Sequence, residues 1–306
     1  MILFAAAILA VIVLGLAALI YTPDRPRAEL NVGYLAAPGD MREVSGIRLH
    51  VRDTGPRDAP ALVLLHGFGA SLHTWEPWAV ALSRQYRVIR LDLPGFGLTG
   101  PDPTGDYSDA RFNQILTALL DQLGVARATL IGNSLGGRLA WMFAAAQPDR
   151  VDRLVLISPD GFASPGFEYG RAPKVPAVMR LLPYALPRPM LRASLAPAYA
   201  DPDRLTAATV TRYNDMMRAP GVRQAILDRT AQVMLQDPTP LLRRIQAPTL
   251  LLWGEEDHMI PIRNAADYLA AMPHARLVRL PHLGHVPFEE APDQALAPVL
   301  AFLAEK

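Results

Sequence analysis

The chain has 306 residues, which is enough for one large globular domain that buries a substantial core. Its 30 basic and 29 acidic residues leave a formal charge of +1, so the overall charge gives no reason to expect a nucleic-acid partner. It contains no cysteine, which excludes disulfide bonds, thiolate metal sites and a cysteine nucleophile.

The first 21 residues, 1–21, carry no charged side chain and predict a single-pass transmembrane helix. At about 1.5 Å per residue they can cross roughly 30 Å of hydrocarbon. A cleaved signal peptide with a small-residue site at Gly15–Ala17 is the alternative, but no positively charged segment precedes the apolar run. Arg25 and Arg27 follow the span, and the positive-inside rule then places the rest of the chain in the cytoplasm.

Residues 22–40 are rich in proline, charge and small side chains, and they predict a linker rather than a packed element. A single domain is expected over 41–306. Its first strand is predicted around Ile47–Val51, where apolar residues alternate with polar ones.

Continuous apolar runs, typical of strands buried on both faces, recur along the domain with helical stretches between most of them. They are Ala61–Leu65, Val88–Leu91, Ala128–Ile131, Leu154–Ile157, Thr249–Trp253 and Arg276–Leu280. This order predicts an α/β fold with a mostly parallel, doubly wound sheet. The alternation lapses over about 162–242, where prolines punctuate short helical pieces, and this segment is expected to form an inserted helical cap.

Ser134 is the candidate nucleophile. It stands in Gly132–Gly136 (Gly-Asn-Ser-Leu-Gly), directly between a predicted strand and a predicted helix. A serine on such a sharp turn projects toward a base, and the N–H of Leu135 at the helix start can stabilise an oxyanion. The alternative is an ordinary glycine-rich turn with a capping serine.

A second oxyanion donor is expected after an earlier strand, where His66-Gly67-Phe68-Gly69 follows the apolar run that ends at Leu65. The N–H of Phe68 is the candidate. Taken alone, the same residues could be a simple turn with an incidental histidine.

Asp257 follows the strand that ends at Trp253, so its carboxylate is expected at the same sheet edge as the serine. There it can orient a histidine and stabilise its charged form. Glu255, Glu256 and Asp160 are the rival acids.

His285 is the candidate general base, because it lies in the loop after the last predicted strand and has a glycine directly before it. It completes the chain order serine, acid, histidine. His282 and His258 are the alternatives, since most histidines are surface or structural groups.

These ordered motifs, together with Asp92–Gly97 (Asp-Leu-Pro-Gly-Phe-Gly), resemble the α/β-hydrolase family over about 41–306. The resemblance implies a nucleophile on the elbow and a variable cap that shapes the substrate site. The sequence Gly-Asn-Ser-Leu-Gly-Gly is similar to the elbows of meta-cleavage-product hydrolases and of membrane-anchored monoacylglycerol lipases. The carbon–carbon hydrolases commonly have tryptophan after the histidine, where this chain has Val286.

The expected activity is serine hydrolysis of a carboxylic ester, apolar or lipid-like, through an acyl-enzyme and without metal or organic cofactor. Carbon–carbon bond hydrolysis, peroxide or acyl transfer, and a non-enzymatic ligand receptor are the alternatives. The expected partners are a small ester or lipid and, through the N-terminal helix, the membrane. Oligomeric state does not follow from the motifs.

Overall fold

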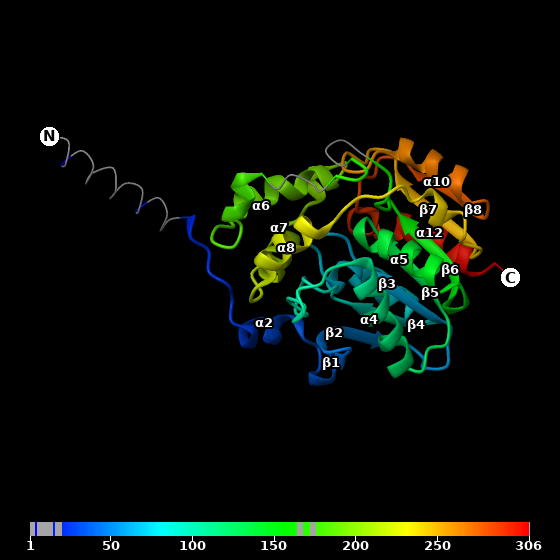
Figure 1. Cartoon of the computed structure of the whole chain (residues 1–306), viewed down its shortest axis with the longest axis horizontal. Coiled ribbons are helices and arrows are strands. Elements are labelled where there is room, and N and C mark those ends of the chain that lie inside the picture. The colour runs from blue at the N-terminus through cyan, green and yellow to red at the C-terminus, as the bar shows by residue number, and fades with distance from the viewer. Residues whose placement is uncertain (1–3, 5–14, 16–19, 164–167, 172–175, 306) are drawn as a thin grey trace.

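An eight-stranded sheet forms the centre of the molecule (Figure 1). The computed structural model describes residues 4, 15, 20–163, 168–171 and 176–305. The strands lie in the order β1-β2-β4-β3-β5-β6-β7-β8; β1 and β2 are antiparallel to their neighbours and β3 to β8 run parallel. Their bounds are β1 Met41–Val44, β2 Ile47–Thr54, β3 Ala61–Leu65, β4 Arg87–Leu91, β5 Ala128–Asn133, β6 Val151–Ile157, β7 Thr249–Gly254 and β8 Ala275–Leu280. The predicted mostly parallel α/β sheet is therefore confirmed.

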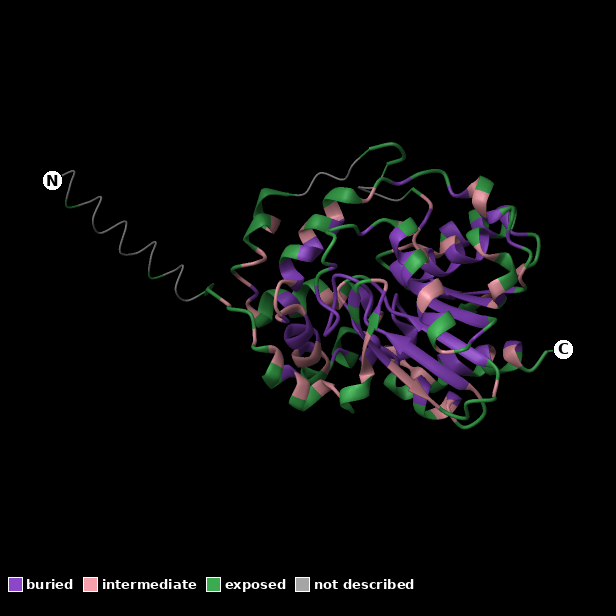
Figure 2. Cartoon of the chain, turned by 60° about the horizontal axis from the view of Figure 1, so that its bottom comes forward, coloured by how far each residue is buried: buried purple, intermediate pink, exposed green. Residues whose placement is uncertain are grey.

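Both faces of the sheet are covered by helices, which explains why its strands are continuously apolar. Along β3, Val63 and Leu65 pack into one core and Leu62 and Leu64 into the other. Figure 2 shows the central strands of the sheet buried and the helices exposed on their outer sides. The first core is covered by α4 (Asp109–Gln122), α5 (Leu135–Ala146) and α10 (Ala265–Ala271), and the second by α3 (Glu76–Leu82) and α12 (Pro292–Leu303).

The insertion between β6 and β7 contains helices and no strand in its described part. Its longer elements are α6 (Arg188–Leu195), α7 (Ala207–Met217) and α8 (Val222–Gln232), followed by the short α9 (Thr239–Leu242). The remaining elements are α11 (Pro287–Glu290) and the 3₁₀ turns Pro38–Asp40, Leu72–Trp75, Pro148–Arg150, Ala177–Leu181, Ala196–Ala198, Pro202–Arg204 and Ile262–Asn264.

The segment expected to be a linker is instead partly helical and packed. Helix α2 (Arg27–Tyr34) buries Leu30 completely. Its packing depends on a distant partner, Asp215 of α7, which lies 2.8 Å from Arg25 and accepts a 2.8 Å hydrogen bond from the Tyr34 hydroxyl. The composition of residues 22–40 could not indicate these long-range contacts.

The predicted transmembrane helix, residues 1–21, lies outside the described residues except for positions 4, 15, 20 and 21. Within the described part of the chain, no helix has both the length and the apolar character needed to cross a bilayer. Where the description resumes, Tyr21 forms a β-bridge with Ala185, and the Thr22 N–H donates to the Tyr184 carbonyl at 2.8 Å. The chain thus enters the folded body beside the insertion.

Candidate active site

Ser134 occupies a strained turn between β5 and α5. Its φ is +52°, a value that is unfavourable for a residue with a side chain. The Ser134 N–H donates to the Ile157 carbonyl at 3.0 Å, and the Ser134 carbonyl accepts from Arg138 N–H at 2.9 Å. The backbone is therefore fixed on both sides, and the side chain remains half-exposed at the carboxyl end of the sheet.

The glycines around Ser134 are required by close backbone approach. A Cβ at Gly136 would overlap the backbone oxygens of Leu65 and His66, and a Cβ at Gly132 would overlap the backbone of Gly136. Any other residue would force β5, α5 and the loop after β3 apart. The two glycines that mark the elbow in the sequence are therefore needed because the carboxyl ends of β3 and β5 pack closely together.

The loop after β3 runs directly beside the serine, because a Cβ built on Gly67 would lie 3.4 Å from the Ser134 Cβ. His66 holds this loop: its Nε2 accepts from Leu93 N–H at 3.0 Å, and its Nδ1 donates to the Gly67 carbonyl at 2.7 Å. Burial lowers the pKa of His66, in keeping with this neutral tautomer. In a trans peptide the carbonyl and N–H point in opposite directions, so His66 also fixes the direction of the Phe68 N–H.

Asp257 and His285 form a buried pair. The Nδ1 of His285 donates to Oδ2 of Asp257 at 2.8 Å, while Oδ1 of Asp257 accepts two 2.8 Å hydrogen bonds from Met259 and Ile260 N–H. Burial raises the pKa of the Asp257 carboxyl, but the His285 ring and the hydrogen bonds outweigh burial and hold the pKa below its ordinary value. The carboxylate is thus ionised, and Nε2 of His285 is left to exchange a proton.

The pair lies next to the serine elbow, because the side-chain amide of Asn133 donates to the His285 carbonyl at 3.0 Å. Asn133 immediately precedes Ser134, so this bond ties the histidine loop to the turn that carries the serine. The structure therefore brings together the elbow, the loop of Phe68 and the Asp257–His285 pair.

The rival residues are not part of the Asp257–His285 pair. Glu256 pairs with His282 at 3.2 Å on the surface, where the His282 side chain is 92% exposed. Glu255 also faces an exposed arginine, and His258 is exposed. Asp160 follows β6, and its carboxylate is 3.8 Å from an arginine of α5. Among the described residues, none of these rivals hydrogen-bonds to the Asp257–His285 pair.

Glu290 joins the histidine loop to the insertion. Its Oε2 accepts from Gly284 N–H at 2.8 Å, and its Oε1 accepts from Asp201 N–H at 2.9 Å. The His285 N–H in turn donates to the Ala198 carbonyl at 2.8 Å. Gly284 permits this contact, since a Cβ there would lie 2.6 Å from the same carbonyl.

The neighbouring Glu289 makes a second connection to the insertion. Its buried carboxylate accepts from the Tyr199 hydroxyl at 2.6 Å, and it also contacts Arg212 of α7 and Thr74 after β3. Neither glutamate stands out in the sequence, because two acids after a histidine motif look like a solvated helix start. Only the folded chain shows that both face the insertion.

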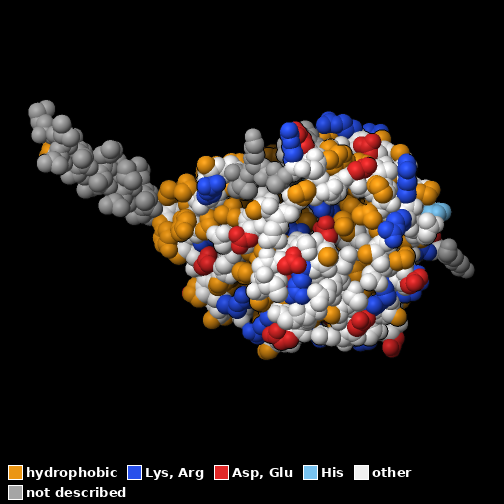
Figure 3. Space-filling model, in the orientation of Figure 1, with side chains coloured by type: hydrophobic (Ala, Val, Ile, Leu, Met, Phe, Trp, Pro, Cys, Tyr) orange, Lys and Arg blue, Asp and Glu red, His pale blue; other side chains and the backbone are white. Residues whose placement is uncertain are grey.

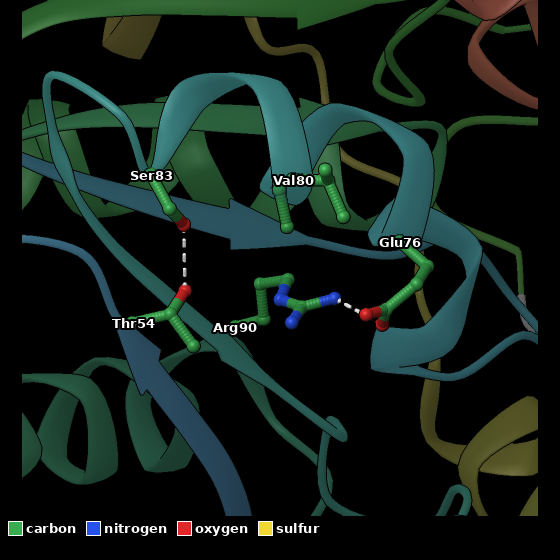
Figure 4. A pocket seen from close by; sticks show the side chains of 6 residues that line it. Thr54, Glu76, Val80, Ser83 and Arg90 are labelled. Atoms are coloured by element: carbon green, nitrogen blue, oxygen red, sulfur yellow. Dashed lines mark hydrogen bonds and ion pairs between the residues drawn. The ribbon is translucent and has the colours of Figure 1, made fainter.

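A separate cavity of about 230 Å³ lies on the α3 side of the sheet, away from these residues (Figure 4). Four of its polar side chains contact one another in pairs: Arg90 pairs with Glu76 at 2.7 Å, and the Thr54 and Ser83 hydroxyls are 2.8 Å apart. No candidate catalytic residue lines it. Within the described residues, no cluster of three or more histidine, aspartate or glutamate side chains is placed to hold a metal ion.

The fold agrees with comparison to known families. A family model described as the alpha/beta hydrolase fold matches residues 60–292. This span is more than half of the chain, and the protein belongs to the α/β-hydrolase family.

Similar proteins include hydrolases with different named substrates. A 2-hydroxy-6-oxo-6-phenylhexa-2,4-dienoate hydrolase of Burkholderia cepacia is 28% identical over 269 residues, covering 85% of this chain and 93% of that protein. A meta-cleavage product hydrolase of Pseudomonas fluorescens has a TM-score of 0.75 at 25% identity, covering 87% and 98% of the two chains. A bacterial membrane phospholipase A has a TM-score of 0.74 at 25% identity, covering 99% and 98%.

Proposed function

We propose that this protein is a serine hydrolase that cleaves carboxylic esters through an acyl-enzyme on Ser134. The observation that carries the proposal is the buried Asp257–His285 pair, with its 2.8 Å hydrogen bond, in a loop bonded to the serine elbow. A neutral imidazole held by an ionised carboxylate is the arrangement that activates a serine hydroxyl at neutral pH.

In the proposed reaction, Nε2 of His285 takes the Ser134 proton while Oγ attacks the ester carbonyl. The N–H groups of Phe68 and Leu135 stabilise the tetrahedral oxyanion, aided by the positive end of α5. His285 then protonates the leaving alcohol and later activates the water that releases the acid. Asp257 holds the tautomer throughout and stabilises the imidazolium.

The proposed substrate is lipid-like, and the proposed location is a membrane surface reached through residues 1–21. Apolar side chains are exposed on the insertion next to Tyr21, where the N-terminal segment joins the body (Figure 3). They are Val178, Leu181, Tyr184 and Met190. The similarity to a membrane phospholipase A over 99% of this chain supports both parts of the proposal.

Active-site labelling tests the nucleophile. The full chain in detergent should react with a fluorophosphonate and turn over p-nitrophenyl esters, whereas Ser134→Ala should do neither. Asp257→Asn should keep its fold and lose about 10⁴-fold in kcat because the histidine tautomer is no longer held. A folded wild type that neither labels nor turns over any ester would overturn the enzyme proposal in favour of a ligand receptor.

Carbon–carbon bond hydrolysis is the second candidate, because the Burkholderia and Pseudomonas relatives act on such dienoate or meta-cleavage products. Parallel assays with a 2-hydroxy-6-oxo dienoate and with p-nitrophenyl esters discriminate between the two. A higher kcat/KM for the dienoate would replace the ester proposal. Product analysis in the presence of an alcohol or hydrogen peroxide would reveal transfer instead of hydrolysis.

Membrane attachment has its own test. The full chain should sediment with membranes and require detergent for release, whereas a chain lacking residues 1–21 should not. A reporter fused to the C-terminus tests the proposed cytoplasmic orientation, and reporter activity outside the cytoplasm would reverse it.

A further inference from the structure

Arg229 is an unusual residue for its position. It continues the buried face of α8, which also includes Val222, Ala225 and Ile226 at helical spacing, yet it places a guanidinium where an apolar side chain is expected. The residue is only 4% exposed. Burial lowers the pKa of Arg229 to about 10, so the side chain is still charged at neutral pH.

No carboxylate among the described residues lies within 4.0 Å of the Arg229 guanidinium, and none of them accepts a hydrogen bond from it. The two nearby acids are already engaged by Arg138, with Asp109 at 2.8 Å and Asp160 at 3.8 Å. Residues 164–167 and 172–175 contain no acid that could supply a partner. Asp109 and Asp160 attract the Arg229 guanidinium and raise its pKa, but burial outweighs them. A buried charge that makes no direct ion pair is costly, and an oxyanion bound beside it would lower that cost.

Phe96 links the guanidinium to the loop that carries the proposed oxyanion donor. The guanidinium carbon is 5.9 Å from the centre of the Phe96 ring, which in turn makes an edge contact at 5.5 Å with Phe68, the residue of the proposed oxyanion donor. Asp160 connects the guanidinium to the serine elbow. Its carboxylate attracts Arg229, and its N–H donates to the Ser134 carbonyl at 3.1 Å.

Helix α8 is held over this region by specific contacts. Gln232 accepts from Tyr107 N–H at 2.9 Å and donates to the Gly105 carbonyl at 2.8 Å. These bonds join α8 to the loop that follows β4. These bonds fix α8, and with it the backbone of Arg229, relative to that loop.

We propose that Arg229 binds a carboxylate or phosphate group of the substrate, so that the ester accepted at Ser134 is acidic at one end. A planar guanidinium binds either oxyanion through paired N–H donors. This inference rests on the proposed ester hydrolysis and narrows its substrate class to amphiphilic, negatively charged esters.

Two matched pairs of substrates test the inference with the full chain in detergent. The carboxylate pair is mono-p-nitrophenyl suberate against p-nitrophenyl octanoate, and the phosphate pair is 1-octanoylglycerol 3-phosphate against 1-octanoylglycerol. Wild type should prefer the charged member of one pair, which identifies the oxyanion. Arg229→Met should lower that ratio of kcat/KM at least tenfold, and Arg229→Lys less.

Arg223→Met is the matched control, because Arg223 is equally buried on the same helix but is paired with Asp24 at 2.7 Å. It should keep the wild-type ratio even where it lowers the melting temperature. No preference for a charged member in wild type, or ratios unchanged in Arg229→Met, would overturn the inference.

A binding measurement separates this inference from the proposed activity. Ser134→Ala protein, titrated calorimetrically with monomethyl suberate and with glycerol 3-phosphate, should bind one of them, and Ser134→Ala/Arg229→Met should lose that binding. Binding of neither probe overturns the anion site whether or not the protein hydrolyses esters. Anion binding without fluorophosphonate labelling would instead retain the site and reject the serine hydrolase.

Discussion

Replacing Glu290 by alanine should both destabilise the protein and slow its reaction. The carboxylate accepts hydrogen bonds from Gly284 N–H at 2.8 Å and Asp201 N–H at 2.9 Å, and the substitution removes both acceptors. Asp201 is exposed, so water can replace the acceptor there, whereas Gly284 is buried. Hydrogen bonds to a charged group contribute about 1.5–3 kcal/mol each, so a loss of about 2–4 kcal/mol is expected.

At about 2–4 °C per kcal/mol, the melting temperature of Glu290→Ala should fall by roughly 4–16 °C. Turnover should fall as well, because Gly284 directly precedes His285 and a shift of about 1 Å in a catalytic group can cost 10²-fold in rate. The assays are scanning calorimetry and ester kinetics at a temperature where both proteins are folded.

Glu256→Ala is the control, because it removes a glutamate that pairs with an exposed histidine at 3.2 Å on the surface. Surface pairs of this kind contribute about 0–1 kcal/mol, so its melting temperature should change by no more than about 4 °C. If Glu290→Ala unfolds earlier but keeps the wild-type kcat, Glu290 stabilises the insertion without positioning the histidine loop, and the reasoning is refuted.

Three other substitutions test features of the fold and elbow. Burial raises the pKa of Asp92, but His50 at 2.8 Å and nearby histidines outweigh it and hold the pKa well below the unfolded value of about 3.9. The contribution of this carboxylate to stability is complete above about pH 5 and is lost progressively as the pH falls below the unfolded pKa toward the much lower folded pKa. Asp92→Asn should therefore cost more in urea unfolding at pH 7 than at pH 3; equal costs would contradict the pairing. Gly136→Ala should not fold, whereas Gly33→Ala, whose new methyl meets open space, should match wild type in soluble yield and circular dichroism. Because glycine accepts the φ of +52°, Ser134→Gly should be more stable than Ser134→Ala by about 1 kcal/mol and should melt at a higher temperature. The difference is the roughly 1–3 kcal/mol of relieved backbone strain minus the entropic cost of glycine. A lower melting temperature for Ser134→Gly would argue against strain at the elbow.

Most of the sheet could be predicted because parallel strands covered on both faces are continuous apolar runs, as β3 and β7 are. Strand β1 could not, since only Val44 of its residues is fully buried and the strand lies at the sheet edge. Helix α2 was also missed, because its packing depends on ion pairs and hydrogen bonds to Asp215, some 180 residues away along the chain.

The candidate site was predictable where its chemistry is local. The elbow around Ser134 can be recognised in the sequence, because a sharp turn between a strand and a helix needs small residues such as Gly132 and Gly136 beside the serine. The alignment of the Phe68 N–H by His66 depends on Leu93. Within the described residues Arg229 makes no direct ion pair, because the nearby Asp109 and Asp160 lie closer to Arg138. Such relations between distant segments leave no pattern along the chain.

The contacts of residues 22–25 bear on how this protein can be shortened for laboratory work. Thr22 bonds to Tyr184, and Asp24 pairs with Arg223 at 2.7 Å and accepts from Gly221 N–H at 2.9 Å. A chain cut at the start of the sheet would discard one partner of every such contact along with the apolar terminus. A fragment that begins at Tyr21 removes most of the apolar stretch and keeps these contacts. Enzyme assays on a fragment cut at the start of the sheet would therefore also measure the effect of an insertion that has lost its contacts with residues 22–25.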